Sequence, residues 1–309
     1  MGEHFDLYFA GWYNDDMMKI IIENDYNQLL SNINERDQIY KYIEAKKIGW
    51  KGKLLIDSGA FSIHKSKKEV PLQDYIDFLN ANHEYLDYYI QLDDIPGEWG
   101  RKPTPEEVAD SPKKTWENYL YMVDRLVEPK KLLPVFHQGE DFSYLRQMLE
   151  YRDKDGKPIE YICISSNKSL DAKRRYEWYK RCYDVIERSS NPNVKTHSLG
   201  TQSQRHINSI PFTSADATSW ILSAGNGTLF TKYGTLYVSD HGLNLKKNIA
   251  NGIAVDTIKE YFESKGFTLD ELASSSSERV KWNLMYLGDW AKYERKYIGP
   301  KSFKIRRLF

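Results

Sequence analysis

The chain has 309 residues, with 44 lysines and arginines against 44 aspartates and glutamates, so its formal net charge is zero. This balance argues against a protein that binds nucleic acid through overall positive charge alone. With 40% hydrophobic and 28% charged residues, the composition excludes a largely disordered chain and allows a large folded core. The length is normal for one α/β barrel, and we expect residues 1–309 to form a single domain.

Short apolar runs alternate along the chain with longer segments of helical periodicity. Most of these runs are apolar on both faces, as buried parallel strands are. They are Phe5–Trp12, Leu54–Phe61, Tyr88–Asp94, Leu132–Gln138, Tyr161–Ser166, Val194–Gly200 and Ser214–Ile221. The alternation predicts an α/β fold, either a parallel barrel or a doubly wound sheet.

The segments between the runs are predicted to be helices. Apolar residues recur at i, i+3, i+4 and i+7 in Pro71–Leu86 and in Pro112–Val127, and Asp171–Arg188 is similar. For the second of these helices we expect Ser111 as the N-cap and Pro112 as the first helical residue. We also expect a long helical stretch over Asp15–Lys47, lying over the barrel or at a dimer surface.

The pattern changes after Ile221. Apolar segments on both sides of Tyr233-Gly234, namely residues 228–230 and 236–238, predict a β-hairpin. Two helices are expected beyond it, near Thr257–Lys265 and Ser277–Arg295, with Ser274–Ser277 as a loop.

The two cysteines, Cys163 and Cys182, form no C-x-x-C pair, so we expect neither a disulfide scaffold nor a thiolate zinc site. No apolar run approaches the roughly 20 residues of a membrane span. The start of the chain carries Glu3 and Asp6 and has no basic region typical of a signal peptide. We therefore expect a cytoplasmic protein in a reducing compartment, without membrane contact.

Polar residues gather at the carboxyl ends of the predicted strands, where barrel enzymes place their active sites. They are Asp57, Ser58, Asp93, Asp94, His137, Gln138, Gly139, Ser165, Ser166, His197, Gly200 and Asp216. A carboxylate in an apolar strand is unfavourable unless it is paired or used. Alternatively, each aspartate is a helix cap, the histidines are satisfied core residues and the polar residues of Ser214–Ile221 are wall packing. Their concentration at one end of successive strands favours a functional site.

Six segments, in order between about residues 50 and 235, resemble motifs of one enzyme family. They are Asp57–Ser62 (DSGAFS), Asp93 in QLDDIPG, His137–Glu140 (HQGE), Ser165–Asn167 (SSN), Asp216 in SADATSW and Gly225–Thr231 (GNGTLFT). They are similar to motifs of the queuine/guanine tRNA transglycosylases. The resemblance is closer to relatives in phages and bacteria that place 7-deazaguanines into DNA.

The resemblance implies a TIM-type (β/α)8 barrel that exchanges guanine in a polynucleotide for a 7-deazaguanine, such as 7-cyano-7-deazaguanine, by double displacement. The free base is then a co-substrate, and no cofactor is expected. Asp216 corresponds to the nucleophile, and we assign Asp57 as the acid and base. Asp93, or Asp94 if the register is one residue off, would read the donor edge of guanine. The other expected substrate-binding residues are Ser58, Phe61, Gln138, Gly139, Ser165, Ser166 and His197.

The chain also departs from the family. The tRNA enzymes carry three cysteines and a histidine on zinc near the C-terminus, whereas the last cysteine here is Cys182, so no zinc subdomain is expected. Since that subdomain helps to hold tRNA, its absence favours DNA as the substrate. Gly59-Ala60 and Ser165-Ser166 replace glycine pairs of the family. The fold predicted overall is a TIM-type barrel with its core at about 50–240, a hairpin insertion and a helical, basic extension at about 255–309.

Polynucleotide backbone contacts require cations. One candidate is the stretch Lys173–Arg181, with Arg174 and Arg175, where Tyr176, Trp178 and Tyr179 would stack on bases; the alternative is a solvated helix face. The other candidate is the C-terminal stretch with Lys304, Arg306 and Arg307. The segment Gly97–Asp110 is long enough for a lid or a strand-clamping loop.

Three other functions remain open from the sequence. The first is a tRNA-guanine transglycosylase that has lost its zinc site. The second is a hydrolase in which water replaces the incoming base. The third is a catalytically inactive barrel that binds nucleic acid. We expect DNA as a partner and the host cytoplasm as the location if the chain is phage-encoded, and a homo-oligomer is a further possibility.

Overall fold

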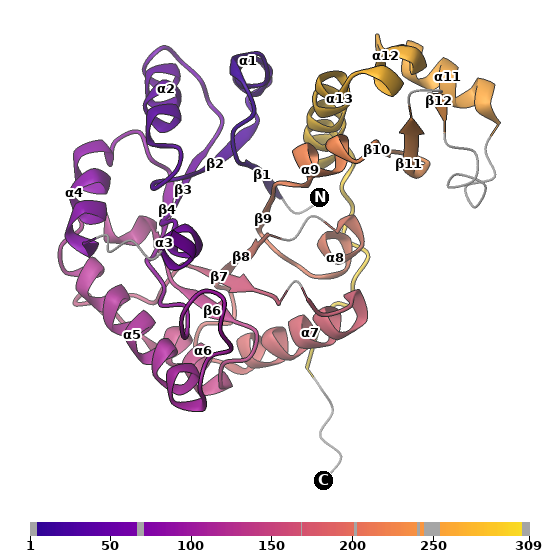
Figure 1. Cartoon of the computed structure of the whole chain (residues 1–309). Coiled ribbons are helices and arrows are strands. Elements are labelled where there is room, and N and C mark those ends of the chain that lie inside the picture. Colours follow the sequence, from indigo (N-terminus) through magenta and orange to yellow (C-terminus); the bar gives the residue numbers. More distant parts are fainter. Residues whose placement is uncertain are drawn as a thin grey trace.

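The computed structural model describes residues 5–66, 71–167, 169–200, 203–239, 242–243 and 254–304. Its main feature is a nine-stranded parallel sheet, curled into a nearly closed barrel and surrounded by helices (Figure 1). This arrangement is compatible with a TIM-type barrel and confirms the predicted α/β class. The strands follow the order β5-β4-β3-β2-β1-β9-β8-β7-β6. Their bounds are β1 Asp6–Ala10, β2 Asn27–Ser31, β3 Leu54–Asp57, β4 Tyr88–Ile90, β5 Leu132–Leu133, β6 Val135–His137, β7 Tyr161–Ser165, β8 Lys195–Leu199 and β9 Ser214–Ala217.

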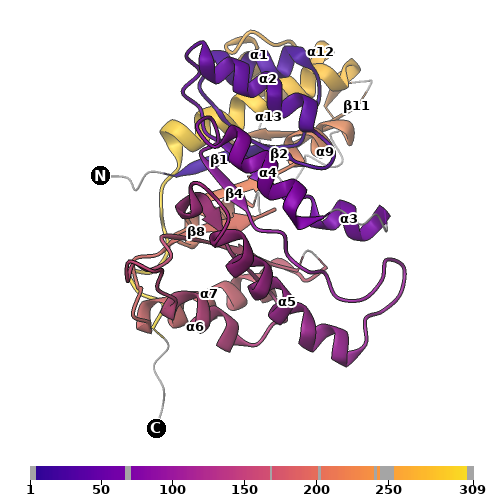
Figure 2. The same cartoon turned by 90° about the vertical axis from the view of Figure 1, so that its left-hand side faces the viewer.

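Helices follow most strands and cover the outside of the sheet (Figures 1 and 2). They are α1 Asp15–Glu23, α2 Arg36–Lys47, α3 Ala60–Ser66, α4 Leu72–Asn82, α5 Pro105–Val123, α6 Phe142–Glu150, α7 Ala172–Arg188, α8 Gln204–Ser209 and α9 Ser219–Gly225, with a 3₁₀ turn at Pro129–Lys131. The predicted helices over 71–86 and 171–188 are thereby confirmed. Figure 2 shows α3 and the loop that precedes α5 projecting on one side of the barrel, opposite the start of β1. None of the helices in the described part of the chain is long and apolar enough to cross a membrane.

The two edge strands of the sheet are neighbours in the chain. Only Pro134 separates β5, which pairs with β4, from β6, which pairs with β7. Proline has no N–H to donate to the ladder, so it interrupts a strand. Its carbonyl still accepts a hydrogen bond from the Cys163 N–H, 2.7 Å away. One short stretch of chain therefore borders both edges of the sheet and brings them together.

The prediction of a helical stretch over Asp15–Lys47 was wrong, because β2 divides it into two helices. β2 lies in the sheet between β1 and β3, with Leu29 opposite Leu55. Its Gln28 is buried, and the side-chain amide donates to the Gly11 carbonyl (2.9 Å) while its oxygen accepts from Tyr42 (3.0 Å). The barrel core therefore begins at β1, well before the predicted start near residue 50.

The expected N-cap at Ser111 was also wrong, because α5 begins seven residues earlier, at Pro105. Thr104 and Glu107 form a reciprocal capping box there, and Pro105 takes the first position of the helix, where a missing N–H has no effect. Pro112 lies inside the helix. Ser111 is buried, and its hydroxyl donates to the Asp94 carbonyl at 2.5 Å. The candidate lid over 97–110 is therefore a loop only as far as Thr104.

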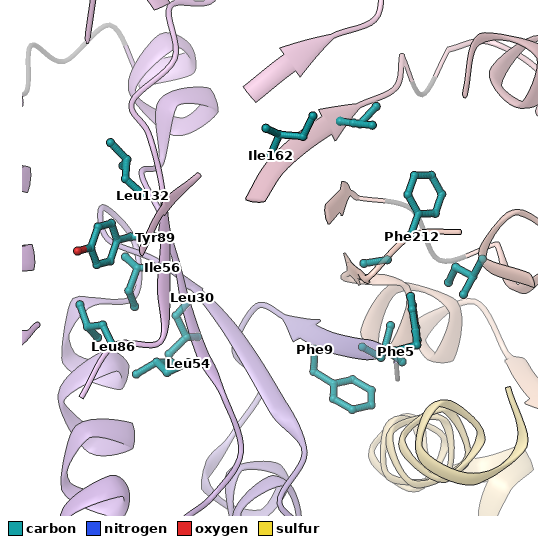
Figure 3. Close-up of a cluster of buried hydrophobic side chains, with 14 of the residues drawn as sticks. Phe5, Phe9, Leu30, Leu54, Ile56, Leu86, Tyr89, Leu132, Ile162 and Phe212 are labelled. Carbon is teal, nitrogen blue, oxygen red and sulfur yellow. The ribbon is translucent and has the colours of Figure 1, made fainter. Parts of the chain in front are cut away.

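Alternating side chains of each strand face the helices and the barrel interior. In β3, Leu54 and Ile56 pack toward the helices, together with Leu30 (Figure 3). Leu55 belongs to a separate cluster inside the barrel, with Tyr8, Ala10, Leu29, Ile90, Leu133, Val135, Tyr161 and Cys163. Asp57, two residues after Leu55, therefore faces inward at the end of its strand.

The described residues between β10 and Glu294 pack beside α9 as a small layer (Figure 1). It holds β10 Thr228–Thr231, β11 Gly234–Ser239, β12 Gly242–Leu243, α11 Val255–Glu263, α12 Leu269–Ser274, α13 Ser276–Asp289 and a π-helical turn at Trp290–Glu294. The predicted hairpin is confirmed by the antiparallel pairing of β10 and β11. α12 was not predicted, and the expected loop at 274–277 shrinks to Ser275, which caps α13. Trp282 lies at the centre of the cluster that joins the hairpin to these helices.

Candidate functional site

A cavity of about 790 Å³ opens at the carboxyl ends of the parallel strands. Nine of the residues expected at the site line it: Asp57, Phe61, Asp93, Asp94, Gln138, Gly139, Ser165, Ser166 and Asp216. They come from segments far apart in the chain and meet because the carboxyl ends of neighbouring parallel strands share one edge of the sheet.

Two other expected substrate contacts do not line the cavity. Ser58 is 1% exposed, and its hydroxyl has no hydrogen-bond partner among the described residues. His197 is fully buried and lies behind Asp216. In this structure the two side chains are therefore not placed to touch a ligand in the cavity, and their contact with the substrate stays a prediction.

The expected nucleic-acid contacts lie away from the cavity. On α7, Arg174 is exposed beside Asp171 (3.4 Å), and Arg175 is partly buried. The neighbouring Trp178 and Tyr179 are buried in the core, so the prediction that they stack on bases was wrong. Their burial follows from the inward face of an amphipathic helix. Lys304 is exposed, whereas Arg306 and Arg307 lie outside the described residues.

Asp216 is held by two donors on one oxygen. Its Oδ1 accepts the Gly200 N–H at 2.8 Å and lies 3.1 Å from Nε2 of His197. Among the described residues, no partner reaches Oδ2. The carboxylate is therefore fixed in orientation, with its second oxygen left for a ligand in the cavity.

A chain of buried hydrogen bonds extends behind Asp216. Nδ1 of His197 lies 2.5 Å from the Ser214 hydroxyl, which lies 2.5 Å from the Tyr161 hydroxyl. A carboxylate only accepts, so Nε2 of His197 is the donor to Asp216. The Ser214 hydroxyl bridges Nδ1 of His197 and the Tyr161 hydroxyl, so both ring nitrogens have a hydrogen-bond partner. These contacts hold the imidazole against the carboxylate.

Asp57 is the carboxyl group whose protonation the cavity alters most clearly. Burial, together with the nearby charge of Asp93, raises its pKa from 3.8 to about 7. Asp216 and Glu35 act in the same direction, whereas the Gly59 N–H, which donates to Oδ2 at 3.0 Å, opposes the shift. A carboxyl group with a pKa near neutrality can both give and take a proton.

The turn after Asp57 depends on glycine. Gly59 has a φ of +83°, and a Cβ there would lie 2.5 Å from Cγ1 of Ile33. This turn carries the N–H that reaches Asp57 and leads into α3. The next residue, Ala60, is buried and helical, so a methyl group is accommodated there.

His137, at the end of β6, lies between two carboxylates. Its Nε2 is 2.9 Å from Asp93, and its Nδ1 is 2.8 Å from Glu140. Burial opposes protonation of this ring, but the hydrogen bonds and charges of the two partners outweigh it and raise the pKa of His137 to about 10. His137 is therefore an imidazolium at neutral pH. The sequence placed it in a motif without giving it a role.

The turn after His137 leaves few backbone and side-chain groups free to bind a ligand. The Gln138 N–H donates to the Ser165 carbonyl at 2.9 Å, and its side-chain oxygen accepts the Asn167 N–H at 3.0 Å. Its backbone N–H is therefore engaged within the protein. The Gly139 N–H has no hydrogen-bond partner among the described residues and remains a donor at the cavity wall.

The cavity is strongly acidic. Its lining carboxylates are Glu35, Asp57, Asp93, Asp94, Glu140 and Asp216, and no lysine or arginine of the described residues lines it. Within the described part of the chain, His137 is the one cation in the lining. This negative charge repels anionic groups such as phosphate.

Several of the first fifty residues complete the wall of the cavity. The sequence did not reveal them as lining residues, because β2 was not recognised as a strand. Glu35 accepts the Ser31 N–H at 2.8 Å, and burial raises its pKa. Gly11 and Asn34 lie near it in the lining. Inside the helical stretch predicted over Asp15–Lys47, Glu35 carried no pattern that marked it as part of the cavity.

Exposed aromatic side chains stand at the mouth of the cavity. Phe61 is 60% exposed and meets Trp99, which is 44% exposed, edge to face at 5.3 Å. Nζ of Lys65 lies 5.8 Å from the Trp99 ring, and the His64 ring lies 6.1 Å away. Phe61 thus borders the cavity at its rim, and Trp99, which sequence reasoning did not single out, extends the aromatic surface outward.

In the described part of the chain, no group of three or more His, Cys, Asp or Glu side chains is arranged to hold a metal ion. No protein-family model matches the sequence, and neither does any curated protein.

Proposed function

We propose that the chain is a DNA-guanine transglycosylase that exchanges guanine in DNA for a 7-deazaguanine base, through a covalent ester between Asp216 and the sugar. The main support is the pair of carboxyl groups on one cavity. Asp216 is oriented by two donors on one oxygen, and Asp57 has a pKa of about 7. A fixed nucleophile beside a group that exchanges protons at neutral pH is what base exchange with retention requires.

In the first displacement, Oδ2 of Asp216 attacks C1′ of the target deoxyguanosine. The C1′–N9 bond breaks, and its electron pair leaves with guanine. Protonated Asp57 gives its proton to the departing base. The products are the Asp216 ester, neutral guanine and the Asp57 carboxylate, so charge and protons balance.

In the second displacement, the incoming 7-deazaguanine loses the proton of its N9–H to Asp57 and attacks C1′. The ester bond breaks, and Asp216 is released as a carboxylate. Two inversions give net retention, and no ATP is consumed. His197 and Gly200 stabilise Asp216 as it leaves, since both donate to its Oδ1.

Base recognition follows from groups that remain unpaired. The N1–H and the 2-amino group of guanine are donors, so the unpartnered oxygen of Asp93 is their natural acceptor. The Gly139 N–H is the donor best suited to guanine O6. We assign Ser165 and Ser166 to the edge that carries the 7-substituent, and Phe61 to the base plane at the rim.

The acidic cavity supports a substrate whose backbone stays outside while one base enters. The target nucleotide must leave the helical stack, which costs a few kcal/mol. We favour DNA over tRNA because the chain has no cysteine after Cys182 to form the zinc site of the tRNA enzymes. Lys304 and the basic residues that follow it remain candidates for backbone contact.

We also propose that the sheet is a (β/α)8 barrel of the TIM type. β5 and β6 are separated by Pro134 alone and border opposite edges of the sheet. Counted as one strand bent at the proline, they reduce the nine strands to eight. The position of the cavity at the carboxyl ends of the strands agrees with this class of barrel.

The test is guanine exchange. Purified protein is incubated with radiolabelled guanine and, in parallel, with duplex DNA, single-stranded DNA or tRNA. Label in DNA but not in tRNA is the expected result, and its loss in Asp216→Asn ties the activity to this site. Label in tRNA alone would favour a tRNA enzyme, and guanine release without label uptake would favour a hydrolase. No reaction with any polynucleotide would contradict the proposal.

A further inference from the structure

His137 lines the cavity, and several hydrogen bonds hold it in one position. Glu140 accepts the backbone N–H of His137 (3.1 Å) as well as its ring Nδ1 (2.8 Å), and the Glu140 N–H donates to the His137 carbonyl (3.2 Å). Three hydrogen bonds thus join the same two residues. On its other side, the ring reaches Asp93 at 2.9 Å.

These contacts determine the charge of the ring. A carboxylate has no proton to donate, so each ring nitrogen must be the donor to its own partner. Both nitrogens then carry hydrogen, and the ring is an imidazolium. The side chains of Asp93, Glu140 and His137 are 13%, 11% and 29% exposed, so water screens these ion pairs little.

The same contacts fix the orientation of Asp93. His137 occupies Oδ2 of Asp93 at 2.9 Å, and among the described residues no partner reaches Oδ1. The result is a carboxylate with one oxygen fixed and one presented to the cavity.

We propose that His137 is the positioning residue that sets base specificity, by holding Asp93 with its free oxygen turned to the cavity as an acceptor for bases with adjacent N–H donors. This inference rests on the proposed function. Guanine and 7-deazaguanines offer N1–H and a 2-amino group to one carboxylate. Hypoxanthine lacks the amino group, and adenine presents an acceptor at N1 that the free oxygen of Asp93 repels. An Asp93 side chain that is no longer held by His137 would make this distinction less well.

The test measures binding of the free base, so it does not depend on exchange. Equilibrium dialysis with radiolabelled guanine and with radiolabelled hypoxanthine gives two dissociation constants for each variant. For the unmodified protein we expect guanine to bind more tightly by about tenfold or more, the value of one hydrogen bond to a charged group. His137→Gln should weaken guanine binding about tenfold and bring the two constants close together.

Two further variants keep the test decisive. Glu140→Gln preserves the shape of the turn, removes one anionic partner and should reduce the preference less, even if His137→Gln folds poorly. His83→Gln removes a histidine at the end of α4, remote from the cavity, and should change neither constant. Thermal unfolding of each variant shows whether it is folded.

The outcomes separate this inference from the function. If guanine exchange occurs but His137→Gln and Glu140→Gln keep the full preference for guanine, His137 does not set specificity and the proposed function stands. If the preference depends on His137 but no polynucleotide is modified, the positioning role of His137 is supported and the transglycosylase proposal fails. An unmodified protein that binds both bases equally would overturn the inference outright.

Discussion

Asp57→Asn is expected to stabilise the folded protein at neutral and alkaline pH while abolishing its activity. The pKa of Asp57 rises from 3.8 to about 7 because the native cavity disfavours its charged form. A shift of about 3 units corresponds to ~4 kcal/mol, at about 1.4 kcal/mol per unit. Asparagine is neutral and nearly isosteric, and its oxygen can still accept the Gly59 N–H, so the unfavourable charge disappears while the turn remains.

The sign of the pH dependence follows from proton binding. Between pH 4 and pH 7 the unfolded chain loses the proton of Asp57 while the native protein keeps it, so this group lowers stability as the pH rises. The advantage of Asp57→Asn should therefore be absent near pH 4, grow up to about pH 7 and then stay constant. Exchange activity should fall by about 10²–10⁴ because the proton donor is lost.

The assay is urea unfolding of both proteins at several pH values between 4 and 8, analysed as a free energy of unfolding at each pH. Asp155→Asn, at an exposed turn, is the matched control and should show no comparable pH-dependent gain. A constant difference between Asp57→Asn and the original chain at all pH values would refute the electrostatic reasoning. Retained exchange activity would remove Asp57 as the proton donor.

Two other substitutions test the surroundings of the site. His197→Phe keeps an aromatic ring in place but removes the donor to Oδ1 of Asp216. We expect kcat to fall about 10- to 100-fold and the free energy of unfolding to fall by ~1–3 kcal/mol, because buried polar groups lose their partner. An unchanged kcat would show that the contact has no catalytic consequence. Trp99→Ala removes the exposed ring at the mouth of the cavity. Since stacking on a base contributes ~1–3 kcal/mol, the KM for DNA should rise about tenfold or more, while the dissociation constant of free guanine should not change. Equal weakening of DNA and guanine binding would place Trp99 in the base site instead.

Much of the sheet was predictable because its strands are apolar on both faces. The same principle explains why β2 was missed. Asn27, Gln28 and Ser31 make its sequence polar, and only the folded structure shows that Gln28 is buried with its amide paired to Gly11 and Tyr42. A buried polar strand has no apolar pattern to reveal it, so Glu35, which follows it, was missed as well.

The candidate site was predictable where carboxylates interrupt apolar strands, as at Asp57 and Asp216. The side chains that contact the carboxylates of the site were harder to predict. His137 lies 2.9 Å from Asp93, which follows a different strand, and His197 contacts Asp216 from behind the cavity wall. Such pairings depend on which side chains of neighbouring strands face inward together, and that register is a property of the closed sheet rather than of any local motif.

The most direct test of the central claim is to trap and map the covalent intermediate. The protein would be incubated with a guanine-containing DNA oligonucleotide without free base, denatured in acid, digested and examined by mass spectrometry. The account predicts a sugar–ester adduct on the peptide that contains Asp216, and none in Asp216→Asn. An adduct on another carboxylate, or label exchange without any adduct on Asp216, would contradict it.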